Sequence, residues 1–431
     1  MTKDATKQLA DAVLPLVRTR TDLHRWSAAN RYGYDAHQAV NLLTDAARTQ
    51  PAPVVFAVTQ RAIASTLRAI ARADDSSGII GDAIRMMLQL HAELACKAPP
   101  TPAKLVNWMI AFQFDNVVDY FNIDPVAYAA ALGETGLVRY RTELDQIAAQ
   151  LPPDPTPEEE QRIFSQRIPH PDQWDQLIST RLTRGILEWN ARRLAVLDKD
   201  VDAIIATHAR DKKVAAWYHD TAKALAEIGE YDLAIDWARQ ATMFGPGHQS
   251  ITAGHYWHKL VAEHHPENEL ATLQTLFVRW PTSEHATLIY QAVEDQWPNH
   301  REQVMDALKQ HPAQAVSFAL GALQDPQQAW ELAHELELDN PHLWETLADQ
   351  YQTIDPAAVL PIYTQIVHDT LKQANAKNYK TAARRLAQMR LLTAGTPLAT
   401  QVDQLITELR QTHHRRPRLQ TEFDKAGLPK I

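Results

Sequence analysis

Prolines recur at regular intervals in the second half of the chain, and this spacing constrains the fold more than any other feature. Pro246, Pro281, Pro312 and Pro341 are separated by 35, 31 and 29 residues. Because proline interrupts helices, a period of this size is typical of stacked pairs of helices. One pair cannot bury its apolar face alone, so we expect about four or five hairpins in a helical solenoid.

One of these units carries a recognisable pattern, IGEYDLAIDWARQATMFGP. Glycine allows a tight turn between helices, small residues permit close approach, and aromatic residues supply packing surface. The preceding segment places an aromatic and a small residue, Tyr218 and Ala222, four positions apart. Later units such as LATLQTLFVRWP lose the signature, so we describe the array as TPR-like. The positions that match the second helix of a tetratricopeptide repeat are Gly229, Tyr231, Ala234, Trp237, Ala241 and Pro246.

The composition predicts an all-α fold. The 431 residues are 45% apolar and 22% charged, with only 13 glycines. Alternating Val, Ile and Thr runs are nearly absent, which argues against a substantial sheet. Helical periodicity is clear over Ala36–Arg48, Pro53–Arg72 and Gly81–Lys97. The length exceeds what one compact core usually holds, so we expect two domains or an elongated array.

A proline-rich acidic segment, LPPDPTPEEE, is the clearest break in the chain. Its prolines remove backbone donors, and the acidic run that follows suits the start of a helix. We therefore interpret this segment as a linker between two helical regions. The predicted parts are an N-terminal helical domain over 1–150, the linker over 151–160, a TPR-like array over 161–412 and a basic tail over 413–431.

Cysteine content and hydropathy indicate the compartment. A single cysteine, Cys96, excludes an internal disulfide and the usual structural zinc sites. Asp4 and Asp11 interrupt the N-terminal segment, where a secretory signal would show an apolar core. No apolar run approaches the roughly 18 residues that span a bilayer. We expect a cytoplasmic protein that does not contact a membrane.

No pattern in the sequence predicts catalysis or a bound cofactor. The GxSxG, HExxH, Walker and dinucleotide-binding motifs do not occur. Cys96 lies near an expected helix C-terminus, which disfavours a thiolate, so we interpret it as a small buried residue. His255, His258 and Glu263 would supply a metal site only loosely, and we favour surface histidines instead. We predict no catalytic, cofactor-binding or metal-binding residues and no small-molecule substrate.

Four segments carry a family resemblance. They are DDSSGIIGDAIRMMLQLH (Asp74–His91), YAAALGETGLVRYR (Tyr128–Arg141), RGILEWNARRLAVLDKDVDAIIATHARD (Arg184–Asp211) and HRRPRLQTEFDKAGL (His414–Leu428). In them the chain resembles the helical C-terminal region of bacterial SWIM zinc-finger proteins and related TPR-like helical proteins of unassigned function. The zinc element of that family needs a CxC pair followed by Cys and His, which one cysteine cannot supply. The resemblance therefore implies the fold, and not the binding proposed for the zinc element.

Positive charge is concentrated near the C-terminus, although the whole chain has a net charge of −9. Between Leu371 and Arg418 there are ten Lys and Arg residues and two carboxylates, Asp403 and Glu408. Such a segment is either a contact surface for nucleic acid or an acidic protein, or an ordinary solvated helix face. The candidate nucleic-acid contacts are Lys377, Lys380, Arg384, Arg385, Arg415, Arg416 and Arg418.

Two functions follow from these features. We expect a non-enzymatic scaffold or adaptor that holds a peptide or helix of another protein in the groove of the helical repeats. Tyr218, Trp257 and Trp344 are the candidate partner contacts, and Tyr218 also suits the core. The alternative is an accessory nucleic-acid-binding protein that uses its basic C-terminal face on phosphates. Cations that converge on one exposed face would favour nucleic acid, whereas cations paired with carboxylates would favour the scaffold.

Overall fold

The computed structural model describes residues 2–430 except 116–117, 119, 154–155, 157, 160 and 162–170. Within these ranges the chain is all-helical, as predicted, and the one extended pairing is an isolated bridge between Leu23 and Ala73. None of the described helices is long and apolar enough to cross a membrane. The chain divides into two compact units, Met1–Phe244 and Gly245–Ile431. Four of the ten residues of the predicted linker over 151–160 lie outside the described residues, and the predicted domain boundaries stay a prediction.

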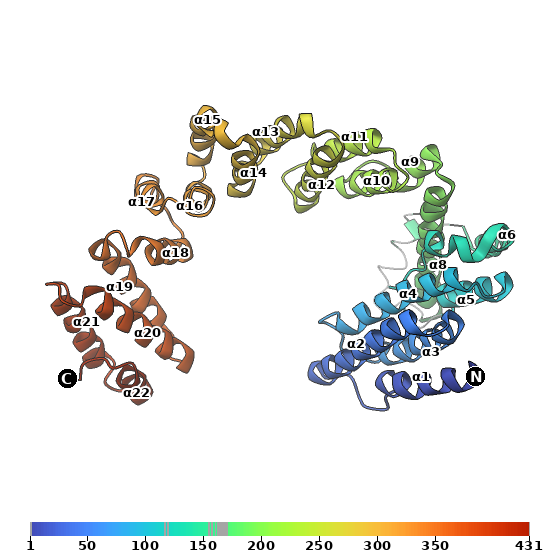
Figure 1. Cartoon of the computed structure of the whole chain (residues 1–431), viewed down its shortest axis with the longest axis horizontal. Coiled ribbons are helices and arrows are strands. Elements are labelled where there is room, and N and C mark those ends of the chain that lie inside the picture. Colours follow the sequence, from blue (N-terminus) through green and yellow to red (C-terminus); the bar gives the residue numbers. More distant parts are fainter. Residues whose placement is uncertain are drawn as a thin grey trace. The chain divides into compact units, whose positions relative to one another are not determined.

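The first unit is a succession of helices that pack mainly on their near neighbours in the chain (Figure 1). Its described helices are α1 (Thr2–Val17), α2 (Trp26–Thr49), α3 (Ala52–Ile70), α4 (Ile79–Lys97), α5 (Pro102–Phe114), α6 (Pro125–Gln150), α8 (Pro171–Asp198), α9 (Val201–Ala209), α10 (Ala215–Glu227) and α11 (Tyr231–Ala241). α3 packs against both α1 and α4, and α2 also packs against α4. The helical segments predicted from periodicity correspond to α2, α3 and α4.

More than half of the residues of helix α3 are buried. Its buried residues recur on most of its circumference, with Val55, Val58 and Ala62 completely buried. A proline in the first turn suits the start of this helix, because the fixed φ of proline is helical and its missing N–H needs no partner there. The remaining exposed stripe of α3 carries Arg61 and Arg68. Burial of the rest of the helix therefore fixes the direction in which these arginines leave it.

A histidine lies at the centre of the first core. The His91 ring is completely buried, with the Phe56 ring centroid 4.2 Å away and the Trp108 centroid 4.1 Å away. Its Nδ1 lies 2.9 Å from the Tyr128 hydroxyl, and its Nε2 has no hydrogen-bond partner among the described residues. Burial lowers the pKa of His91 to about 3, so the ring is neutral in the folded protein at neutral pH.

Helices α10 and α11 form a tight hairpin. Gly229 lies between them with a φ of 91°, a left-handed conformation that glycine adopts without steric cost. Ala234 of α11 is completely buried, and Trp237 packs on Tyr218 of α10 with ring centroids 4.9 Å apart. Tyr231, in contrast, is 40% exposed and supplies less packing surface than the signature predicts. The small and turn-forming residues of the signature therefore have the physical roles assigned to them.

The second unit continues the pattern of short helices that contact their neighbours (Figure 1). Two single turns of 3₁₀-helix, Pro266–Asn268 and Glu294–Gln296, lie between longer elements. Pro312 and Pro341 each occupy the first position of a helix, where their missing N–H is tolerated. The described helices are α12 (His248–His264), α13 (Glu269–Arg279), α14 (Ser283–Val293), α15 (Trp297–Lys309), α16 (Pro312–Gly321), α17 (Pro326–Glu335), α18 (Pro341–Tyr351), α19 (Pro356–Lys372), α20 (Ala376–Thr393), α21 (Ala399–Thr412) and α22 (Pro417–Lys425).

The last helix of the second unit folds back on α20. Leu419 and Phe423 of α22 are completely buried in a cluster shared with α18 to α21. The buried Arg410 of α21 donates a hydrogen bond to Asp424 of α22 at 2.9 Å. The segment predicted as a basic tail therefore contains a docked helix.

The buried His91 predicts an acid-sensitive stability. In an unfolded chain histidine has a pKa near 6.5, so below that pH the unfolded state takes up a proton that the folded state does not. Above about pH 6.5 the neutral His91 therefore costs the folded state nothing relative to the unfolded state. As the pH falls from there toward 3, the free energy of unfolding declines by up to about 1.4 kcal/mol per pH unit. In urea unfolding between pH 7 and pH 4.5, we expect the unfolding free energy of His91→Gln to fall less steeply than that of the wild type. Equal slopes would contradict a neutral, buried His91.

Candidate functional site

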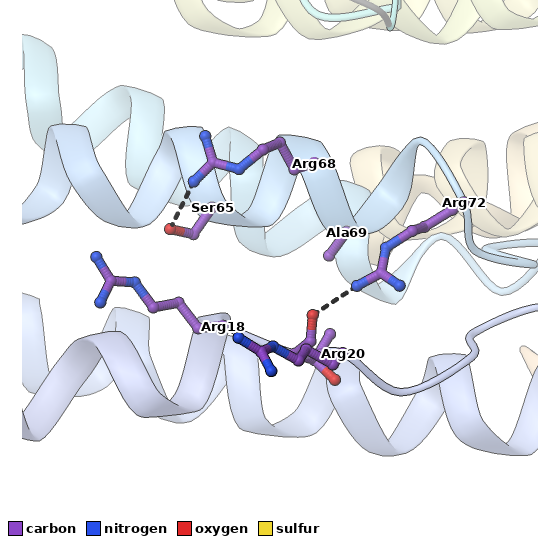
Figure 2. Close-up of a pocket in the computed structure, with 7 residues that line it drawn as sticks. Arg18, Arg20, Ser65, Arg68, Ala69 and Arg72 are labelled. Carbon is purple, nitrogen blue, oxygen red and sulfur yellow. Dashed lines mark hydrogen bonds between the residues drawn. The ribbon is translucent and has the colours of Figure 1, made fainter.

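Four arginines gather around a cleft where α1 and α3 end. The cleft has a volume of about 620 Å³. Figure 2 shows Arg18 and Arg20 on one side of it and Arg68 and Arg72 on the other. The remaining lining residues are small: Thr19, Ser65 and Ala69. We call this feature the arginine cleft.

Hydrogen bonds to the end of α1 hold the two sides of the arginine cleft together. The buried Tyr32 hydroxyl of α2 donates to the carbonyl oxygen of Val17, the last residue of α1, at 2.8 Å. Arg72 donates to the carbonyl oxygens of Thr19 at 2.5 Å and of Thr21 at 3.3 Å. Arg72 therefore positions the segment after α1, and the walls of the cleft are fixed before any ligand arrives.

Among the residues that the structure describes, the four arginines have no carboxylate partner. All of them are exposed, and within the described part of the chain none forms an ion pair. Two helix C-termini meet here, and their negative dipole ends partly offset the positive charge. Burial raises the pKa of Tyr32 to about 12, and Arg72 and Arg68 act in the opposite direction because they stabilise the phenolate. The positive charge of Arg68 and Arg72 therefore acts on the buried Tyr32 hydroxyl beneath the cleft.

Most hydrogen-bond donors of the arginine cleft remain available. Each guanidinium has five N–H donors and no acceptor. Arg68 donates to the Ser65 hydroxyl at 3.4 Å, and Arg18 and Arg20 make no side-chain hydrogen bond to a described residue. Guanidinium groups bind carboxylates and phosphates with paired, charge-assisted hydrogen bonds. The arrangement is therefore suited to binding an anion.

The predicted aromatic contacts lie in packed surroundings. Tyr218 is half-buried between Trp237 and Phe244, with ring centroids 4.9 and 5.1 Å away. Trp257 of α12 is only 6% exposed. Trp344 of α18 is half-buried, and its Nε1 donates to the carbonyl oxygen of Leu338 at 2.8 Å. Their role as partner contacts stays a prediction.

Two of the predicted basic residues are already engaged within the second unit. Arg385 of α20 forms ion pairs with Glu345 and Asp349 of α18, and its side chain is 11% exposed. Arg416 donates to the carbonyl oxygen of Leu371 at 2.8 Å. Arg385 joins α20 to α18 and offers few donors to a ligand, whereas Arg416 uses one of its N–H donors to join the start of α22 to α19.

The other predicted basic residues are exposed. Three of them follow one face of α20 at spacings of three and four residues. Glu422 of α22 is close to this surface: the hydrogen bond from Lys425 lowers its pKa most, and Arg418 and Lys380 lower it further. The predicted residues that are exposed and form no ion pair within the described ranges are Lys377, Lys380, Arg384, Arg415 and Arg418.

The histidines considered for a metal site have separate carboxylate partners. His258 Nε2 lies 3.0 Å from a Glu269 carboxylate oxygen, and His255 Nε2 lies 3.8 Å from Glu284. Glu263 instead pairs with Lys259 at 3.8 Å. Among the described residues, no group of three His, Cys, Asp or Glu side chains is placed to hold a metal ion.

The sequence patterns do not predict the arginine cleft, because its two sides are far apart in the chain. The hydrogen bond between Arg72 and Thr19 joins residues 53 positions apart. One signal is nevertheless present: residues 1–73 contain ten Lys and Arg, five Asp and no Glu, in a chain whose net charge is −9. Helix α3 itself contains no acidic residue. Arginines on a helix without acidic neighbours are the feature that could have indicated the site.

Comparison with known proteins identifies a family. The model of DUF6880, described as a family of unknown function, matches residues 14–418. This range contains all four arginines of the cleft and nearly the whole of both compact units. No curated protein and no solved structure matches the chain.

Arg68 and Arg72 lie on the same side of the cleft, but we predict different roles for them. Arg72→Gln removes the hydrogen bonds to Thr19 and Thr21, and we expect a loss of about 1 kcal/mol in the free energy of unfolding. Arg68→Gln removes a charge that has no carboxylate partner among the described residues, so we expect a change within about 0.5 kcal/mol. Urea unfolding of both variants measures the difference. A loss for Arg68→Gln as large as that for Arg72→Gln would show that Arg68 is structural.

Proposed function

The chain belongs to the DUF6880 family, and from the arginine cleft we propose that it is a non-enzymatic interaction protein that binds an acidic segment of a protein partner. The supporting observation is that four exposed arginines face one cleft without carboxylate partners in the described chain. Clusters of arginine are a recurrent means of recognising acidic or phosphorylated protein segments. The four arginine side chains supply the charge and the hydrogen bonds for such a segment.

The cleft fits a protein ligand better than a nucleic acid. Its lining contains no aromatic side chain on which a base could stack. The cleft offers four arginines, whereas sequence-independent binding to nucleic acid depends on many phosphate contacts along a surface. A net charge of −9 also opposes a long polyanion more than a short acidic segment. We therefore favour a protein partner.

The helical architecture suits an adaptor of this kind. We propose that the hairpins of the second unit form a TPR-like array, supported by the packing of α13 on α14, α16 on α17 and α19 on α20. Stacked hairpins present extended surfaces to a partner. The resemblance to the helical region of SWIM zinc-finger proteins stays a prediction. In this proposal the arginine cleft binds the charged part of the partner.

A second candidate function rests on the basic surface of α20 and α22. Lys377, Lys380 and Arg384 are exposed on one face of α20. Arg418 and Lys380 both lower the pKa of Glu422 in α22, so both act on the same carboxylate. Such cations can contact phosphates of nucleic acid without reading the sequence. The ion pairs of Arg385 reduce the charge available for this role.

Affinity capture with matched variants tests the two functions. Tagged protein is incubated with native lysate, with and without nuclease. A salt concentration of about 150 mM screens surface charges, so it reduces non-specific ionic binding. We expect the wild type to retain a nuclease-resistant protein that the double variant Arg20→Gln/Arg68→Gln does not retain. Quantitative mass spectrometry of the bound fractions measures this difference.

Two further variants serve as controls. Arg48→Gln removes an exposed arginine of the first unit that is already paired with Asp45 at 3.0 Å, so it should leave retention unchanged. Lys380→Gln/Arg384→Gln removes charge from the α20 surface. Recovery dominated by nucleic acid, lost with nuclease and with the α20 variant, would favour the second function. Retention that no cleft variant changes would refute the first.

A further inference from the structure

We propose that the arginine cleft prefers a phosphomonoester dianion, so that the acidic segment it binds is a phosphorylated one. The inference rests on the proposed function and makes it more specific, because carboxylates and phosphates both bind arginine. Three features of the cleft separate the two anions: the arrangement of its donors, its uncompensated charge and its size.

The donors approach from two opposed sides. Arg18 and Arg20 follow α1, whereas Arg68 belongs to α3 (Figure 2). A carboxylate presents its two oxygens in one plane and suits a single guanidinium fork. A phosphate group has three terminal oxygens that point in different directions and can accept hydrogen bonds from both sides at once. The tetrahedral anion therefore makes better use of the two walls.

The charge of the cleft also matches a dianion. Four guanidinium groups line it, and no carboxylate among the described residues forms an ion pair with any of them. At neutral pH a phosphomonoester has a charge of about −1.5 to −2, compared with −1 for a carboxylate. The stronger attraction to the four guanidinium groups favours phosphate, and the negative ends of the two helix dipoles offset part of this attraction.

The size of the cleft leaves room for residues that flank the phosphate. Ligand sites in proteins commonly have volumes of about 300 to 1,000 Å³, and the arginine cleft, at about 620 Å³, lies in this range. A single phosphate would occupy only part of it. Thr19, Ser65 and Ala69 line the remaining surface, and their small side chains can accommodate a peptide backbone.

Thermal unfolding of the full-length protein with capped amino acids tests the preference. The probes are N-acetyl-phosphoserine amide, N-acetyl-glutamate amide and inorganic phosphate, each titrated at constant ionic strength. We expect phosphoserine to raise the unfolding temperature with a dissociation constant at least about tenfold lower than that of glutamate, because more charge-assisted hydrogen bonds form. Equal dissociation constants for phosphoserine and glutamate would overturn the preference and leave the acidic-segment function intact.

The pH dependence of binding supplies a second readout. The second pKa of a phosphomonoester is near 6, so the ligand changes its charge in this range of pH. The effect of phosphoserine should therefore weaken between about pH 7.5 and pH 5.5 with a midpoint near 6. Binding that does not change across this range would show that the dianion is not the form recognised, and would overturn the proposal.

Variants assign the effect to the cleft. We expect Arg20→Gln/Arg68→Gln to abolish the phosphoserine effect, and Arg48→Gln to retain it because Arg48 is paired with Asp45 outside the cleft. A phosphoserine effect that survives in the double variant would place the site elsewhere and overturn the proposal. Inorganic phosphate that binds more tightly than capped phosphoserine would also overturn it, since a free ion would then be the better ligand. If no probe binds and capture of an acidic partner also fails, the proposed function itself is refuted.

Discussion

The meeting of two helix C-termini is the constraint on which the arginine cleft depends. Helix α1 ends at Val17, whose carbonyl oxygen is bound by Tyr32, and α3 ends beside it. Residues at a helix C-terminus are favourable positions for cations, because the dipole and the free carbonyl oxygens are negative there. Arg72 uses this property directly when it donates to the backbone after α1. The fold can therefore hold four positive charges together although none of them forms an ion pair with a described carboxylate.

Pairing with distant carboxylates separates structural arginines from those available for a ligand. Arg193 of α8 binds Asp124 at 2.8 Å and Glu227 at 2.6 Å, and Arg385 and Arg410 likewise pair with carboxylates on other helices. In each of these cases the guanidinium is largely buried, and loss of a partner would leave an uncompensated charge. The arginines of the cleft are exposed and remain solvated. Water solvates their charge in the free protein. When a ligand excludes that water, the electrostatic attraction between the arginines and the ligand becomes stronger.

The sequence was sufficient for the fold class and insufficient for the site, for a physical reason. Helix formation depends on apolar periodicity within about twenty residues, so α2, α3 and α4 could be located from local pattern alone. The charge state of a surface depends on partners that are close only in space. The segment around Arg385 contains few acidic residues, yet Glu345 and Asp349 neutralise it from α18. Conversely, Arg18 and Arg68 become neighbours only through the packing of α1 on α3.

The helices and hydrogen bonds that support the arginine cleft give it a selectivity among anions that net charge alone could not provide. Burial of most of α3 fixes where Arg68 leaves the helix, and the hydrogen bonds of Arg72 fix the segment that carries Arg20. A preformed site loses little conformational entropy on binding, so most of the cost of ordering falls on the ligand. Beyond about 10 Å, salt screens the local positive charge, and the acidic remainder of the chain disfavours extended polyanions. A compact, highly charged group on a flexible segment therefore suits the cleft. Such a group can enter the cleft without bringing further negative charge against the acidic remainder of the chain.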